Sequence, residues 1–194
     1  MAEENQTTHK RRVRYSGKYP KKFEEKYKEL QPEKYKDTIE HVIKKGMHIS
    51  IMVNEILDFL KIQPGETGFD ATLGYGGHTK AMLQCLNGQG HIYATDVDPE
   101  ESARTRKRLE EAGFGEDILT IRLQNFCTID EIAKEAGGFD FILADLGVSS
   151  MQIDNPKRGF SFKVDGPLDL RLNQEAGISA AERLAAITKD ELAG

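Results

Sequence analysis

The stretch FDATLGYGGH, residues 69–78, decides the fold. Apolar residues followed by glycines indicate a strand that runs into a glycine-rich turn, and the next residues continue as a helix. Glycine permits positive φ angles and a close approach of a ligand to the backbone, while the helix presents free N–H groups to a carboxylate-bearing ligand. The spacing is GxGG, with Thr79 where a dinucleotide fingerprint has its third glycine, so the turn disfavours NAD and FAD.

Strand-like and helix-like segments alternate on both sides of this stretch. Helices are expected at 51–60, 77–86, 99–112 and 128–136, and strands at 67–73, 90–95, 118–123 and 139–144. This alternation predicts an α/β fold with a parallel sheet covered by helices. Ligands then bind at the carboxyl ends of the strands.

Two further strand ends carry carboxylates. Asp96 ends the second strand, 20 residues after Gly76, where an acid can accept hydrogen bonds from both hydroxyls of a ribose. Together with the glycine turn, Asp96 implies an adenosine-type ligand, although a capping role is the alternative. Asp98 precedes Pro99 and is interpreted as a helix N-cap. Asp145 ends the fourth strand and can contact a cofactor or accept a proton from a substrate amine.

Aromatic and basic residues suggest further contacts. Phe126, after the third strand, is placed to close over an adenine, with an ordinary core position as the equal alternative. The tract 151–167 reads as a loop in which bases alternate with aromatics, a pattern suited to phosphates and an unpaired RNA base; the other interpretation is that the aromatics pin the loop to the core. The expected RNA contacts there are Lys157, Arg158, Phe160, Phe162 and Lys163.

Composition limits the class of protein. With 194 residues, 38% hydrophobic residues and a mean hydropathy of −0.55, one soluble domain without a membrane span or export signal is expected, located in the cytoplasm. Cys85 and Cys127 are too far apart for a CxxC clip, so neither a metal site nor a disulfide is expected. Residues 1–46 carry 13 Lys and Arg against 8 Asp and Glu, whereas the rest carries 14 against 24. This basic arm suits a polyanion, although a solvated extension is the alternative.

The ordered motifs DATLGYGGHT at 70–79, ATDVDP at 94–99, ILADLGVSSMQIDNPKRGFSF at 142–162 and DGPLDLRL at 165–172 resemble those of a known family. It is the family of bacterial 16S ribosomal RNA cytosine-N4 methyltransferases, also called RsmH or MraW. The resemblance implies a class I methyltransferase fold (Rossmann-like and doubly wound), S-adenosylmethionine as methyl donor, and a cytosine of small-subunit ribosomal RNA as acceptor. The cofactor contacts that it implies are Gly76, Gly77, His78, Asp96, Phe126, Asp145 and Gln152.

The resemblance also assigns roles and boundaries. Asp145 is the first candidate for the catalytic group that accepts a hydrogen bond from the cytosine amine. His78 is expected to orient the cofactor, and a role as general base is its less favoured alternative. The expected organisation is a basic extension at 1–46, a methyltransferase domain at 47–167 and the start of a helical cap insertion at 168–194. Since family members continue beyond this point, the sheet is expected to be incomplete, with a strand edge open to self-association. Two alternatives stay open: an inactive cofactor- or RNA-binding fragment, and a methyltransferase for a protein or small molecule.

Overall fold

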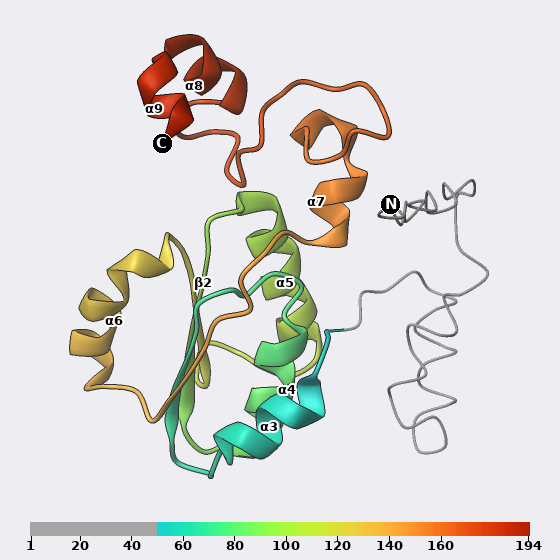
Figure 1. Ribbon diagram of the computed structural model, residues 1–194. Coiled ribbons are helices and arrows are strands. Elements are labelled where there is room, and N and C mark those ends of the chain that lie inside the picture. The colour runs from blue at the N-terminus through green and yellow to red at the C-terminus, as the bar shows by residue number, and fades with distance from the viewer. Residues whose placement is uncertain (1–49) are drawn as a thin grey trace, which may run out of the picture. The chain divides into compact units, whose positions relative to one another are not determined.

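The computed structural model describes residues 50–194, so the basic arm lies outside the described residues (Figure 1). A sheet of four parallel strands forms its centre: β1 (Thr67–Asp70), β2 (His91–Asp96), β3 (Leu119–Leu123) and β4 (Phe141–Leu143). Their order is β3-β2-β1-β4, and Asp70 of β1 pairs with Ala94 on one side and Leu143 on the other. The predicted parallel α/β sheet is confirmed.

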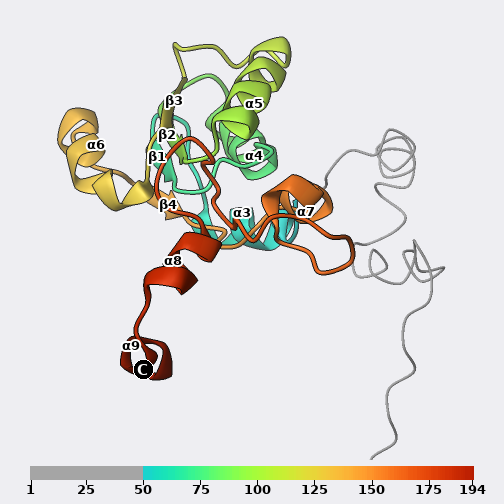
Figure 2. The same ribbon diagram turned by 90° about the horizontal axis from the view of Figure 1, so that it is seen from above.

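Helices cover both faces of this sheet. On one face lie α3 (Val53–Leu60), α4 (Gly77–Leu86) and α5 (Pro99–Glu111), and on the other lies α6 (Ile129–Ala136), as the two views show (Figures 1 and 2). Side chains of a strand alternate between faces. Ile92 and Ala94 of β2 therefore join the larger apolar cluster with α4 and α5, whereas Tyr93 packs with Phe69 and the buried Ile132 of α6.

Local hydrogen bonds set the ends of these elements. Asp98 accepts hydrogen bonds from the backbone N–H groups of Glu100 and Glu101, and Pro99 opens α5, which confirms the predicted N-cap. The first strand was expected to reach residue 73 but ends at Asp70. There the carboxylate accepts a hydrogen bond from the N–H of Thr72 at 3.0 Å, and this side chain-to-backbone bond turns the chain out of the sheet.

The segment after β4 is more ordered than expected. Residues 151–167 were expected to form a loop, but α7 (Ser150–Asp154) and the 3-10 turn η2 (Pro156–Arg158) occupy its first half. The reason is a capping box, in which Ser149 and Gln152 each bind the other's backbone N–H. Two more short helices follow, α8 (Ala180–Ala186) and α9 (Lys189–Ala193), and neither buries a residue.

One edge of the sheet is open. Within residues 50–194, β4 pairs only with β1, and its Ile142 is 52% exposed. An unpaired apolar strand edge is a template for association, but the expected self-association stays a prediction. Residues 50–194 contain no helix that is both long and apolar enough to cross a membrane.

Candidate cofactor-binding site

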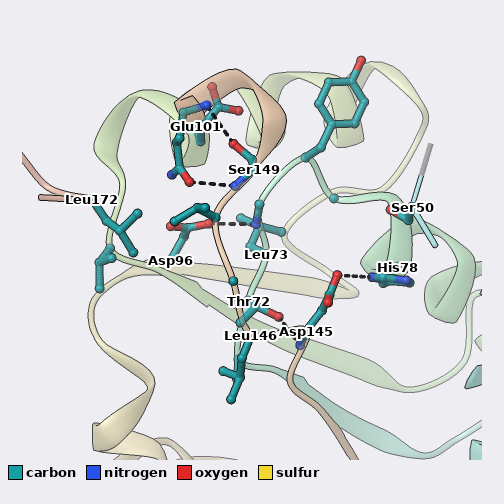
Figure 3. Close-up of a pocket in the computed structure, with 18 of the residues that line it drawn as sticks. Ser50, Thr72, Leu73, His78, Asp96, Glu101, Asp145, Leu146, Ser149 and Leu172 are labelled. Atoms are coloured by element: carbon teal, nitrogen blue, oxygen red, sulfur yellow. Dashed lines mark hydrogen bonds and ion pairs between the residues drawn. The ribbon is translucent and has the colours of Figure 1, made fainter. Parts of the chain in front are cut away.

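The carboxyl ends of all four strands open into one cavity of about 370 Å³, within the size range of small-molecule sites. Its wall includes residues 71–78 after β1, 96–97 after β2, 124–126 after β3 and 145–152 after β4. Ser50, Ile51, Glu101 and Leu172 complete the wall. Figure 3 shows Glu101 and Ser149 on one side of the cavity and His78 and Ser50 on another.

Side chains of α5 pack against the glycine turn at residues 74–77. Gly76 has φ 79°, and a Cβ at this position would lie 2.6 Å from the methyl carbon of Thr105, so both the backbone angle and the space require glycine. The Thr105 hydroxyl donates a hydrogen bond to the carbonyl of Gly74 at 2.5 Å. The guanidinium of Arg108 stacks on the Tyr75 ring, 3.8 Å from its centroid. These contacts hold the turn in a single shape.

Asp96 links the glycine turn to the start of α5. One carboxylate oxygen accepts a hydrogen bond from the N–H of Gly74 at 2.8 Å, and the other accepts one from the N–H of Asp98 at 2.9 Å. Burial raises the pKa of Asp96 above its ordinary 3.8, and these two backbone hydrogen bonds oppose that rise. A carboxylate has about four lone-pair sites, so these two bonds leave room for a ligand donor.

A buried carboxylate supports the position of Asp145 through Thr72. Asp70, 1% exposed, accepts hydrogen bonds from the hydroxyl of Thr79 at 2.6 Å and from the backbone of Thr72. Burial raises the pKa of Asp70, and these hydrogen bonds oppose the rise. The Thr72 hydroxyl in turn accepts a hydrogen bond from the backbone N–H of Asp145 at 2.8 Å. The end of β4 is thereby fixed beside the glycine turn.

The side chains of His78 and Asp145 point toward each other in the wall of the cavity (Figure 3). The Nε2 atom of His78 lies 2.8 Å from the carbonyl oxygen of Ile51, and since a carbonyl only accepts, Nε2 carries a hydrogen. The Nδ1 atom lies 3.8 Å from a carboxylate oxygen of Asp145. In a neutral His78, two acceptors therefore face each other, and a ligand that brings N–H donors would satisfy both.

The cavity is acidic. Its wall contains the carboxylates of Asp96, Glu101 and Asp145, and no lysine or arginine is among the lining residues that the structure describes. Such a wall favours a cationic ligand and opposes the pyrophosphate of a dinucleotide. The part of the chain from residue 50 onward holds no group of three or more His, Cys, Asp and Glu side chains that could bind a metal ion.

The model of the MraW methylase family matches residues 45–194. The chain belongs to this family. It is 80% identical over 199 residues to ribosomal RNA small subunit methyltransferase H 1 of Agathobacter rectalis, covering 100% of this chain and 56% of that protein. A protein of the same name from Lachnoclostridium phytofermentans is 67% identical over 197 residues, covering 99% of this chain and 54% of that protein. The chain thus spans about half the length of the curated relatives it matches.

Solved structures are also similar to part of this chain. One of them is a SAM-dependent O-methyltransferase from Thermotoga maritima, 15% identical, with a TM-score of 0.41; the match covers 46% of this chain and 35% of that one. The parallel sheet, the helices on both of its faces and the family together make this a class I, Rossmann-like methyltransferase fold.

All the cofactor contacts expected in the MraW-family chain line the cavity; they are Gly76, Gly77, His78, Asp96, Phe126, Asp145 and Gln152. Their role as ligands stays a prediction. Phe126 is 42% exposed, so its ring has a free surface for an adenine. Gln152 reaches the wall with its amide already engaged, because its nitrogen donates to Asp98 at 3.0 Å and its oxygen accepts from the N–H of Ser149.

The expected RNA contacts of the MraW-family chain lie outside the cavity wall. Lys157, Phe162 and Lys163 are exposed, and Phe160 is half-buried. Arg158 requires a correction: its side chain is 7% exposed, pairs with the fully buried Asp98 at 2.5 Å and donates to the carbonyl of Leu172 at 2.6 Å. A buried cation is retained where it is paired, so Arg158 connects the segment around Leu172 to the N-cap of α5 instead of facing RNA.

Sequence reasoning missed several lining residues of the MraW-family site. Leu172 lies far along the chain, and no local pattern signals its return to the cavity. Glu101 looks like an ordinary acidic residue in the first turn of a helix, yet it is 4% exposed. Gln124 directly follows the strand expected at 118–123 and precedes the predicted Phe126 by two residues, so it could have been found by including every residue between that strand end and Phe126.

Proposed function

We propose that this MraW-family chain is the cofactor-binding part of a methyltransferase that uses S-adenosylmethionine to methylate the exocyclic N4 of a cytosine in small-subunit ribosomal RNA. The observation that carries the proposal is the acidic cavity, where the glycine turn, Asp96 and Asp145 converge from different strands. The printed names of the two relatives support ribosomal RNA as the acceptor. A substrate that is part of the ribosome also supports a cytoplasmic location.

The residues of the cavity fit this cofactor. Asp96 would accept hydrogen bonds from the ribose hydroxyls, Phe126 would contact the adenine, and the free N–H groups at the start of α4 would face the carboxylate. The negative wall suits the positive charges of the sulfonium and ammonium groups. When bound, the cofactor supplies a methyl carbon on a positively charged sulfur, open to a nucleophile.

Asp145 would orient the acceptor amine. The cytosine amine is conjugated with its ring, so an acceptor that stabilises its pyramidal form makes its lone pair available. The Asp145 side chain is 48% exposed and the residue is anchored through its backbone N–H to Thr72, which leaves the carboxylate accessible in a fixed place. His78 Nδ1 is a second acceptor on the same amine, and the proton that the amine loses would pass to Asp145 or to water.

An exposed surface around Phe162 would bind the RNA. The Phe162 side chain is fully exposed, and the exposed Lys157 and Lys163 lie near it in the sequence. An aromatic ring between cations suits an unpaired base and its phosphates. The basic arm at residues 1–46 would add phosphate contacts.

Calorimetry with S-adenosylhomocysteine tests the cofactor. Asp96→Ala should weaken binding by about 1.5–3 kcal/mol, the value of charged hydrogen bonds, and Asp96→Asn should weaken it less. The matched control is Asp117→Ala, which removes an exposed carboxylate outside the cavity wall. Equal affinity of the wild type and both Asp96 variants would contradict the assignment, and a wild type that does not bind would contradict the proposed function.

RNA binding across a salt series tests the acceptor. If residues 1–46 contact phosphates, their deletion should lower the affinity for ribosomal RNA and flatten the salt dependence, by roughly 0.7–0.9 in log–log slope per lost contact. An unchanged slope would make the arm a solvated extension. Transfer of labelled methyl groups to small-subunit RNA supports the enzyme, whereas binding without transfer supports the alternative of a cofactor- or RNA-binding fragment.

We also propose that the free edge of β4 supports self-association of the chain. The exposed Ile142 on this strand and the exposed Leu146 that follows it give the edge an apolar surface. Backbone groups that have no partner in the described sheet would pair with a second copy.

A further inference from the structure

Glu101, in the first turn of α5, is a further carboxylate in the cavity wall. Its side chain is 6% exposed and lines the cavity. One carboxylate oxygen, Oε1, accepts a hydrogen bond from Arg104 at 3.1 Å. The other, Oε2, is buried and has no hydrogen-bond partner in the described part of the chain. A buried polar atom without a partner at the wall of a cavity marks a place where a ligand donor fits.

The position of Glu101 explains why its charge is tolerated. It lies in the first turn of α5, where the helix dipole favours an anion, and its backbone N–H donates to Asp98. The carboxylate therefore has charge compensation from Arg104 and the helix, but Oε2 lacks a donor. A buried acceptor without a donor destabilises the chain, and a ligand hydroxyl or amine that donates to it would recover this loss on binding.

The neighbours of Glu101 indicate which part of a ligand reaches it. Two backbone hydrogen bonds relate it to Asp96: the Glu101 N–H donates to the Asp98 carboxylate at 3.3 Å, and the Asp98 N–H donates to the Asp96 carboxylate at 2.9 Å. Both oxygens of Asp96 already accept a backbone N–H, from Gly74 and from Asp98. A ribose presents two neighbouring hydroxyl donors, so an additional acceptor in the same cavity wall as Asp96 suits it.

We propose that Glu101 is a second carboxylate of the ribose subsite and that its Oε2 accepts a hydrogen bond from a ribose hydroxyl of the cofactor. This assignment rests on the proposed function, because it takes the adenosine-containing cofactor as the ligand. It adds a binding residue that is absent from the expected set of contacts. It also provides a hydrogen-bond donor for the buried Oε2 of Glu101, which has no partner in the described residues.

Calorimetry on the full chain tests the assignment with S-adenosylhomocysteine and its 2′-deoxy and 3′-deoxy forms. Glu101→Ala should weaken binding of the parent ligand about tenfold or more, and Glu101→Gln, which keeps the shape, should weaken it less. Against one of the two deoxy ligands, the loss should largely disappear, because the donor has already been removed. The control is Glu100→Ala in the same helical turn, since Glu100 also contacts Arg104 but is 62% exposed; its affinity should stay within about twofold of the wild type.

The outcomes separate this inference from the proposed function. Wild-type binding with unchanged affinity in both Glu101 variants would overturn the inference and leave the cofactor assignment in place. An equal loss against all three ligands would also overturn it, because Glu101 would then act on another group, such as the adenine amine, or on the fold. If Glu101→Ala does not unfold cooperatively on heating, and so is not properly folded, the affinity of Glu101→Gln for the three ligands decides the outcome. A wild type that binds none of the ligands would overturn both proposals.

Discussion

Replacing Arg158 by methionine should destabilise the chain by about 3–5 kcal/mol, the cost of breaking a buried ion pair by removing one partner. The Asp98 side chain is fully buried and the Arg158 side chain is 7% exposed, so water cannot replace the guanidinium without local opening. The substitution also removes a donor from the Leu172 carbonyl, a bond of about 1 kcal/mol. Gln152 and two backbone N–H groups still bind Asp98, which places the expected loss near 3 kcal/mol.

Urea unfolding followed by far-ultraviolet circular dichroism measures this loss, since the chain contains no tryptophan for fluorescence. Lys157→Met is the matched control, because Lys157 adjoins Arg158 but is exposed; its effect should stay within about 0.5 kcal/mol. Adding Asp98→Asn to Arg158→Met should restore part of the stability, because the uncompensated buried charge is then gone. A loss below about 1 kcal/mol for Arg158→Met would refute the reasoning, since it would mean that Asp98 is hydrated in solution.

Two further predictions concern acid and association. Hydrogen bonds from Arg171 lower the pKa of Asp169 from 3.8 to about 2, so this carboxylate stabilises the fold above about pH 4 and loses that contribution as the pH falls towards 2. An NMR titration should show this low pKa and its return towards 3.8 in Arg171→Gln; identical values in both proteins would contradict it. For the β4 edge, sedimentation should show concentration-dependent association that Ile142→Lys suppresses, whereas Phe59→Lys, at an 84% exposed site on α3, should not. A wild type that stays monomeric, or an Ile142→Lys variant that associates equally, would contradict the role of the edge.

The sequence alone was sufficient for the features that neighbouring residues encode. The strand, glycine turn and helix around Gly76 follow from a short run of residues, because a turn at positive φ and the start of a helix depend on local chemistry. The same is true of the N-cap at Asp98, whose partners are the next residues along the chain. Alternating apolar segments then indicate a parallel sheet, and the carboxyl ends of its strands locate Asp96 and Asp145 in one site.

Only the tertiary structure decided which distant residues meet. The sequence predicts both Arg158 and Phe162 as RNA contacts. In the structure, Arg158 is buried against Asp98, 60 residues earlier, whereas Phe162 is fully exposed. Glu101 resembles any acidic residue of a first helical turn until the fold encloses it and leaves one oxygen without a donor. Such outcomes depend on the path of the whole chain, because burial and long-range pairing arise from packing between elements and leave no periodic pattern in the sequence.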